Sequence, residues 1–277
     1  MPHLIIVDTR GVKFINEHLE VWINLAADPE NDGRNWYAGA ATSVLLHGKE
    51  MLDPFTAELF WRYMCHHQEK RCMQIDQVQL WDAGGTKKLG APVDLAKTPY
   101  RLVRHSRDVD PSCINATLAA PFEVTYALKG QIHGITCELH RAISLATDAD
   151  YLNEELSLEV LSSTEATVTE ARQPRFAVRY YTYINADLPT EPTVPKDVFV
   201  ARSEWWPNPL YGFASDVPIE ALEPKGHSFS FQLSAARSAT CVHFFARHGI
   251  AATSRLTAAT ALKALSSFPN LPRPIAA

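Results

Sequence analysis

Arginine and aromatic side chains are the residues of this sequence whose types and spacing point most directly to chemistry. Arginine outnumbers lysine sixteen to ten, and its planar guanidinium suits paired contacts to phosphate better than a lysine ammonium does. These cations gather with histidine in three stretches: Arg101, Arg104, His105 and Arg107; Arg172, Arg175 and Arg179; and Arg247, His248 and Arg255. The clusters predict a basic groove if they converge in space, and solvated faces with internal ion pairs if they scatter.

A loop rich in tryptophan and proline adds a second candidate surface. It reads Trp205-Trp206-Pro207-Asn208-Pro209-Leu210-Tyr211. Large flat side chains held among prolines can stack nucleotide bases or anchor a partner with little loss of conformational entropy. The alternative is a loop that packs Trp205, Trp206 and Tyr211 into the protein's own core.

Motifs for metals, nucleophiles and nucleotides are absent from the sequence. The Cys-His-His run at 65–67 cannot converge on one ion, because neighbouring helix positions point in different directions. Cys241 and His243 share a strand face near His248, but no Cys-x-x-Cys or His-Glu-x-x-His partner completes a site. No Gly-x-Ser-x-Gly elbow or phosphate-binding glycine loop occurs, and the pair Glu154-Glu155 is interpreted as solvated. We therefore predict no metal and no cofactor.

Composition places the chain among ordinary cytoplasmic proteins. A net charge of −5 argues against coating nucleic acid by bulk electrostatics. The apolar run at 4–7 is too short for a signal peptide or a membrane span, and it predicts a buried strand. Five cysteines form an odd, scattered set, which favours free thiols in a reducing compartment.

The elements that would position these residues indicate an α+β fold. Alternating apolar and polar residues predict strands at 4–7, 19–25, 75–81, 156–161, 176–184, 229–233 and 241–245. Helices are predicted at 54–67 and 254–267, and at 132–145, where Ile132, Ile135, Leu139 and Ile143 recur every three or four residues. His140 lies just beyond that apolar stripe. The expected architecture is antiparallel or mixed sheets with helices packed on one face.

Two modules are expected from the length of 277 residues. The first covers 1–110 and the second 111–277. Within the second, prolines crowd a segment at 186–224. Because proline lacks an amide donor, this segment is predicted to wrap over the surface as extended loops.

The order of these features is similar to that of the RAMP proteins of class 1 CRISPR effector complexes. The likeness covers about 120–220 and is carried by Tyr126-Ala127-Leu128-Lys129-Gly130, the predicted helix, the strand at 156–161, and Arg202 with the Trp206–Tyr211 segment. It is greatest to the subunit that holds the 5′ handle of the guide RNA in type IV systems. The chain departs from that family in its acidic net charge. It also has Ala146-Thr147-Asp148-Ala149-Asp150 where members carry a glycine-rich loop.

The resemblance implies up to two ferredoxin-like modules, an RNA-binding role in antiviral defence, and guide RNA and other effector subunits as partners. The residues it implies for gripping RNA are Arg101, Arg104, Arg107, Arg175, Arg179, Trp205, Trp206 and Tyr211. Some relatives cut RNA without a metal, and His105, flanked by two arginines, would be the general acid or base if this chain does so.

Two other functions remain open on the sequence. One is a small-molecule enzyme with a histidine as its acid–base group and a pocket lined by four tryptophans, which are Trp22, Trp36, Trp61 and Trp81. These side chains are more simply explained as core residues. The other is an interaction protein that exposes the Trp205–Tyr211 loop and has no groove.

Overall fold

A computed structural model describes thirteen stretches of the chain. They are residues 4–7, 11–24, 39–51, 72–94, 101–105, 116–119, 122–132, 135–145, 149–163, 174–183, 196–202, 209–225 and 228–247. The predicted helices at 54–67 and 254–267 lie outside them. Within the described part of the chain, no helix is long and apolar enough to cross a membrane.

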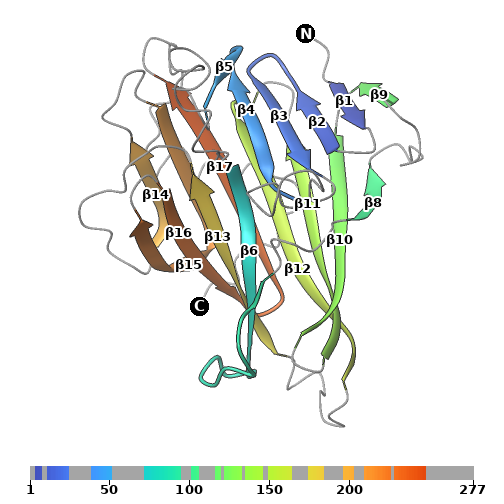
Figure 1. Cartoon of the computed structure of the whole chain (residues 1–277), viewed down its shortest axis with the longest axis vertical. Helices are drawn as coiled ribbons and strands as arrows, with labels where there is room; N and C mark the ends of the chain where they lie inside the picture. Colours follow the sequence, from blue (N-terminus) through green and yellow to red (C-terminus); the bar gives the residue numbers. More distant parts are fainter. Residues whose placement is uncertain are drawn as a thin grey trace, which may run out of the picture.

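All regular structure in these stretches is β-strand, so the predicted α+β class is wrong (Figure 1). The strands are β1 (Leu4–Val7), β2 (Gly11–Ile15), β3 (Leu19–Asn24), β4 (Ala41–Leu46), β5 (Lys49–Glu50), β6 (Cys72–Trp81), β7 (Val93–Asp94), β8 (Arg101–His105), β9 (Ala116–Ala119), β10 (Phe122–Ile132), β11 (Ile135–Leu145), β12 (Tyr151–Ser163), β13 (Arg175–Tyr183), β14 (Lys196–Arg202), β15 (Pro209–Lys225), β16 (Ser228–Ala235) and β17 (Ser238–Arg247). The strands predicted from alternation are confirmed.

The strands pair antiparallel in one curled, barrel-like sheet. Following the pairings, the order is β9, β1, β2, β3, β4, β6, β13, β16, β15, β17, β12, β11, β10 and β8. The curl brings β3 and β4 over β11 and β12, and Figure 1 shows these blue and green-to-yellow strands side by side. The side-chain amide of Asn16 crosses this interior to donate to the Ala149 carbonyl oxygen at 2.7 Å.

The predicted helix at 132–145 is wrong because its apolar residues also fit a strand. Inward positions of β11 alternate as Ile135, Cys137, Leu139, Ile143 and Leu145, all at most 6% exposed. Arg141 occupies the one inward position of the series that is not apolar, and this interruption leaves a spacing that mimics a helix. The ladder with β10 extends from Ile135 opposite Ile132 to Leu145 opposite Phe122.

The proline-rich segment is not only loop, which corrects the prediction for 186–224. It contains β14 and the long strand β15. β15 pairs with β17 up to Ser215 and with β16 from Ile219, so Pro218 lies where the strand changes partners. An amide donor is not needed at that point, which explains how a proline is tolerated there.

The predicted boundary at residue 110 stays a prediction. Strands from both sides of it pair in the one sheet, as β6 does with β13. The core lies inside the curl and includes an aromatic group of Tyr180, Phe213 and Phe231. Burial of each such side chain contributes roughly 1.5–3 kcal/mol.

Candidate functional site

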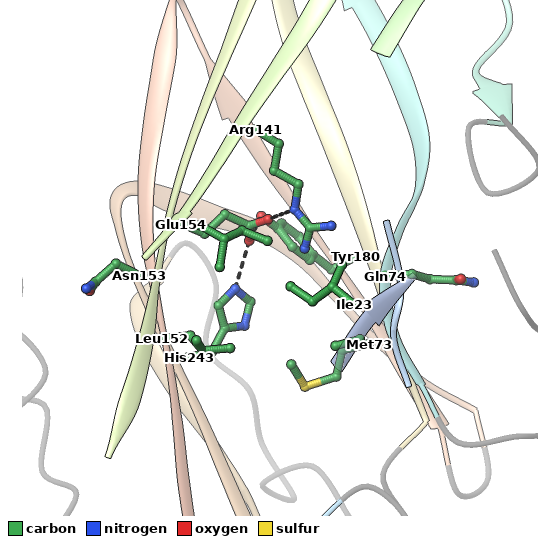
Figure 2. A pocket seen from close by; sticks show the side chains of 11 residues that line it. Ile23, Met73, Gln74, Arg141, Leu152, Asn153, Glu154, Tyr180 and His243 are labelled. Carbon is green, nitrogen blue, oxygen red and sulfur yellow. Dashed lines mark hydrogen bonds and ion pairs between the residues drawn. The ribbon is translucent and has the colours of Figure 1, made fainter. Parts of the chain in front are cut away.

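Four polar side chains converge inside the sheet, and all of them are almost fully buried (Figure 2). Arg141 comes from β11, Glu154 from β12, Tyr180 from β13 and His243 from β17. Their exposed fractions are 5%, 1%, 1% and 4%, in that order. Ionisable side chains are rarely buried in proteins, because the burial of an unpaired charge costs free energy.

Strand register brings the four together. Glu154 lies opposite Cys241 of β17, and His243 is two residues further along the same inward face. On the other edge of β12, Arg141 lies opposite Leu156, which places it diagonally across from Glu154. Diagonal neighbours in an antiparallel pair are within reach of long side chains. Tyr180 reaches the group from β13, which is separated from β17 in the sheet by β16 and β15.

The Glu154 carboxylate is the centre of the cluster. Its Oε2 accepts a hydrogen bond from the Tyr180 hydroxyl at 2.7 Å and lies 2.8 Å from His243 Nε2. Its Oε1 accepts from Arg141 Nε, and Arg141 Nη1 donates to the Gly39 carbonyl oxygen. Both carboxylate oxygens are therefore engaged, and the arginine connects the cluster to the backbone beside β4.

The electrostatics keep Glu154 ionised. Burial alone would raise the pKa of Glu154, but the Arg141 charge together with His243 and Tyr180 lowers it from 4.5 to about 2. Burial raises the pKa of Tyr180 and of Cys241 well above their usual values, and the Glu154 charge adds to both effects. The phenol and the thiol are therefore neutral at physiological pH, and Cys241 is no nucleophile.

Aromatic rings fix the orientation of Tyr180 and His243. Tyr180 stacks on Phe231 with ring centroids 4.8 Å apart and planes 8° from parallel. His243 meets Phe213 edge to face at 5.2 Å. Such contacts restrict both side chains to one geometry, so they form a rigid wall for the cluster.

A small cavity adjoins the cluster. It measures about 10 Å³, which is roughly the space that one water molecule needs. Ile23, Met73 and Leu152 contribute apolar side chains to its wall. The side chains of Gln74 and Asn153 point away from it (Figure 2), so its polar groups are the four already described.

The residues predicted to bind RNA do not form this site. Arg175 and Arg179 lie on β13, and the Arg179 guanidinium pairs with both carboxylate oxygens of Asp76, with Nε at 3.0 and 3.1 Å. Arg101, Arg104 and His105 lie on β8, and Tyr211 on β15, with their side chains outside the described structure. Arg107, Trp205 and Trp206 lie outside the described residues altogether.

The tryptophan-lined pocket of the alternative hypothesis is not seen at the described residues. Trp22 donates to the Asn24 side-chain oxygen at 2.8 Å, and Lys88 lies 5.4 Å over the Trp81 ring. Neither tryptophan lines the cavity, while Trp36 and Trp61 lie outside the described residues. The predicted shared face of Cys241 and His243 is confirmed: both are buried, and Cys241 Sγ lies 3.9 Å from the Tyr180 hydroxyl at the border of the cluster.

Sequence reasoning missed Arg141, Glu154 and Tyr180 as site residues. A signal for two of them exists in the sequence. Arg141 stands between Leu139 and Ile143, and Glu154 between Leu152 and Leu156, each as a charge inside an apolar alternation. The prediction that Glu154 is solvated is wrong, whereas its neighbour Glu155 is exposed as expected.

Comparisons with known proteins give no family. No protein-family model matches the sequence, and no curated protein matches it. Among solved structures, the chain is similar to a 4-α-glucanotransferase from Thermococcus litoralis, with 12% identity and a TM-score of 0.46 over 88% of this chain and 39% of that one. It is also similar to a putative kojibiose phosphorylase from the human microbiome, with 8% identity and a TM-score of 0.44 over 92% of this chain and 33% of that one.

A third similar structure is a putative aldose 1-epimerase from Escherichia coli K12, with 9% identity and a TM-score of 0.42. The matched region covers 88% of this chain and 99% of that one, whereas the chain spans well under half of the other two. Because every one of these TM-scores is below 0.5, the likenesses carry no inference about activity.

The ferredoxin-like and CRISPR assignments are wrong, because the described chain consists of strands without the helices that such modules need. Guide RNA and effector subunits as partners rested on that resemblance, and no finding tests them.

Proposed function

We propose that this protein is an acid–base enzyme for a small neutral molecule, with His243 as the proton-transferring group and Glu154 as the residue that positions it. The observation that carries the proposal is the 2.8 Å contact between His243 Nε2 and a buried, ionised Glu154 beside a cavity. Interior groups with perturbed pKa values and specific charge partners are candidates for functional sites.

Each residue has a distinct role in this proposal. A carboxylate with a pKa of about 2 is a weak base, so Glu154 orients the imidazole through its contact with Nε2 rather than accepting the proton itself. Arg141 keeps the carboxylate ionised. The second ring nitrogen of His243, Nδ1, lies on the side of the ring away from Glu154 (Figure 2), and this nitrogen would exchange the proton with the substrate.

The cavity limits the class of substrate. Its 10 Å³ accommodates a group about the size of a hydroxyl or a carbonyl oxygen. The charges of Arg141 and Glu154 cancel, so no net charge favours an ionic substrate. A neutral compound that presents a hydroxyl or carbonyl group, with apolar carbon against Ile23, Met73 or Leu152, therefore suits the site best.

Proton transfer can be tested on a panel of neutral hydroxy and carbonyl compounds. It would include free aldoses, because opening their rings needs one proton donated and one removed. NMR in D₂O would follow anomer interconversion and deuterium uptake with the wild type, with His243→Asn and with His47→Asn. His47 is exposed and has a φ of 48°, a conformation that asparagine tolerates well, so His47→Asn is the matched control.

We expect the wild type and His47→Asn to accelerate exchange of at least one compound, and His243→Asn to lower that rate by roughly 10²–10⁴-fold. The urea midpoints of all three proteins would be measured alongside to show that each is folded. A folded His243→Asn variant with the wild-type rate would refute the proposal, as would a panel on which the wild type has no effect.

The cytoplasm is the compartment that we propose for this chemistry. Cys241 is a buried thiol that forms no disulfide. Free thiols are kept reduced in the cytosol, whereas oxidising compartments favour disulfides.

A further inference from the structure

A second cluster of ionisable side chains lies on the outer face of the same two strands that carry Arg141 and Glu154. Inward positions of β11 have odd numbers, so Glu138 and His140 share its outer face. Glu159 of β12 lies directly opposite Glu138 in the ladder. The cluster Glu138, His140 and Glu159 is therefore separate from the interior site.

The His140 nitrogen already has spacings from both carboxylates that suit a shared metal ion. His140 Nε2 lies 3.4 Å from Glu138 Oε2 and 3.3 Å from Glu159 Oε2, and all three atoms lie within 4.8 Å of one another. Zinc bonds of about 2.0–2.2 Å to nitrogen and oxygen at tetrahedral angles separate neighbouring ligand atoms by roughly 3.3–3.5 Å. Only the two carboxylates would need to adjust to complete this geometry.

The register places two carboxylates against each other at this point. Like charges directly opposite each other destabilise an antiparallel pair, and Glu138 faces Glu159 on β12, while Lys129 of β10 lies opposite Glu138 on its other side. The Glu138 side chain is only 11% exposed, so solvent screens its charge poorly. A divalent cation held between the two carboxylates would turn this repulsion into attraction.

We propose that Glu138, His140 and Glu159 bind one divalent transition-metal ion, of which Zn²⁺ is the best suited. Imidazole nitrogen and carboxylate oxygen are both ligands that zinc takes in proteins, whereas Ca²⁺ and Mg²⁺ take oxygen ligands. Glu159 is 61% exposed, so the ion faces solvent and water completes its coordination. Ligands on two paired strands are held in place by the ladder, which lowers the entropy lost on binding.

Binding would be measured by isothermal titration of the full chain with zinc chloride, in the wild type and in His140→Asn, Glu159→Gln and His47→Asn. The last variant removes an exposed histidine from the β4–β5 turn and controls for nonspecific binding to imidazole. We expect one site in the wild type and in His47→Asn, weakened tenfold or more in the other two. Visible absorption of bound Co²⁺ would report the coordination geometry directly.

A second measurement separates a metal site from a simple cluster of hydrogen bonds. In chelator-treated protein, added zinc should raise the thermal midpoint of the wild type and should raise that of Glu159→Gln less, because the variant binds the ion more weakly. His140→Asn with the wild-type affinity and stoichiometry for zinc would overturn the proposal. So would a zinc-induced rise of the midpoint that is the same in Glu159→Gln as in the wild type.

Discussion

Replacing Glu154 by glutamine should destabilise the protein by roughly 3–5 kcal/mol. Glutamine keeps the shape of the side chain and can still accept one hydrogen bond, but it removes the carboxylate charge that pairs with Arg141. Arg141 is 5% exposed, so its cation would stay buried after the loss of this ion pair. Breaking a buried ion pair from one side typically costs 3–5 kcal/mol.

The pKa of Glu154 gives a second route to the same magnitude. The folded protein lowers this pKa from 4.5 to about 2, and each pKa unit corresponds to about 1.36 kcal/mol, so the surroundings favour the carboxylate by about 3 kcal/mol. Glu154 is 1% exposed, and no discount for solvent screening is needed. The two arguments agree because both rest mainly on the Arg141 charge.

Urea denaturation at pH 7, followed by circular dichroism, would measure the loss. The matched control is Glu155→Gln, which removes an exposed carboxylate from the next position of β12 and should change the stability by less than about 1 kcal/mol. Adding Arg141→Met to Glu154→Gln should recover part of the lost stability, because the buried arginine cation is then removed. A Glu154→Gln variant within 1 kcal/mol of the wild type would refute this account of the cluster.

Three further outcomes follow from the same structure. The folded state lowers the pKa of Glu154, so its contribution to the free energy of unfolding is complete above pH 4.5 and is lost as the pH falls toward 2. Acid titrations of Glu154→Gln should lack this loss of stability. Tyr180→Phe removes one donor to Glu154 and should lower the free energy of unfolding by about 1–3 kcal/mol in urea. Gly11→Ala would place a Cβ 2.5 Å from the Trp22 ring and 2.6 Å from the Ile23 carbonyl oxygen. Its urea midpoint should therefore fall further than that of Gly48→Ala, where the new Cβ meets no atom and the only cost is the strain of a φ of +75°.

The strands could be predicted from the sequence wherever apolar residues alternate without interruption. Leu19 to Asn24 and the aromatic run of β13 are examples, and the structure confirms both. The strand β11 could not be recognised, because Arg141 at an inward position breaks the period of two. Arg141, a residue of the site, thus prevented the recognition of the strand that contains it.

The site as a whole could not be predicted from residue patterns within single segments of the sequence. Its four residues lie at positions 141, 154, 180 and 243 on four strands, and only the pairing register places them together. The same holds for the outer cluster, in which Glu159 meets Glu138 through the ladder. On the predicted helix, Glu138 and His140 would have pointed in different directions, so no metal site could be foreseen from their spacing.

The strongest rival to the acid–base proposal is a network that serves only to stabilise the fold. Buried ion pairs can often be replaced by apolar side chains of similar volume with no loss of stability, or with a gain of about 1–4 kcal/mol. The double variant Arg141→Met with Glu154→Leu should therefore stay folded, at or near the wild-type urea midpoint, while its proton-transfer rate falls with that of His243→Asn. If instead the double variant loses several kcal/mol and keeps the wild-type rate, the cluster stabilises the sheet and the chemistry lies elsewhere. Stability and rate should move independently, because the carboxylate that positions His243 is not required to hold β11 and β12 together: their ladder pairs ten residues on each side.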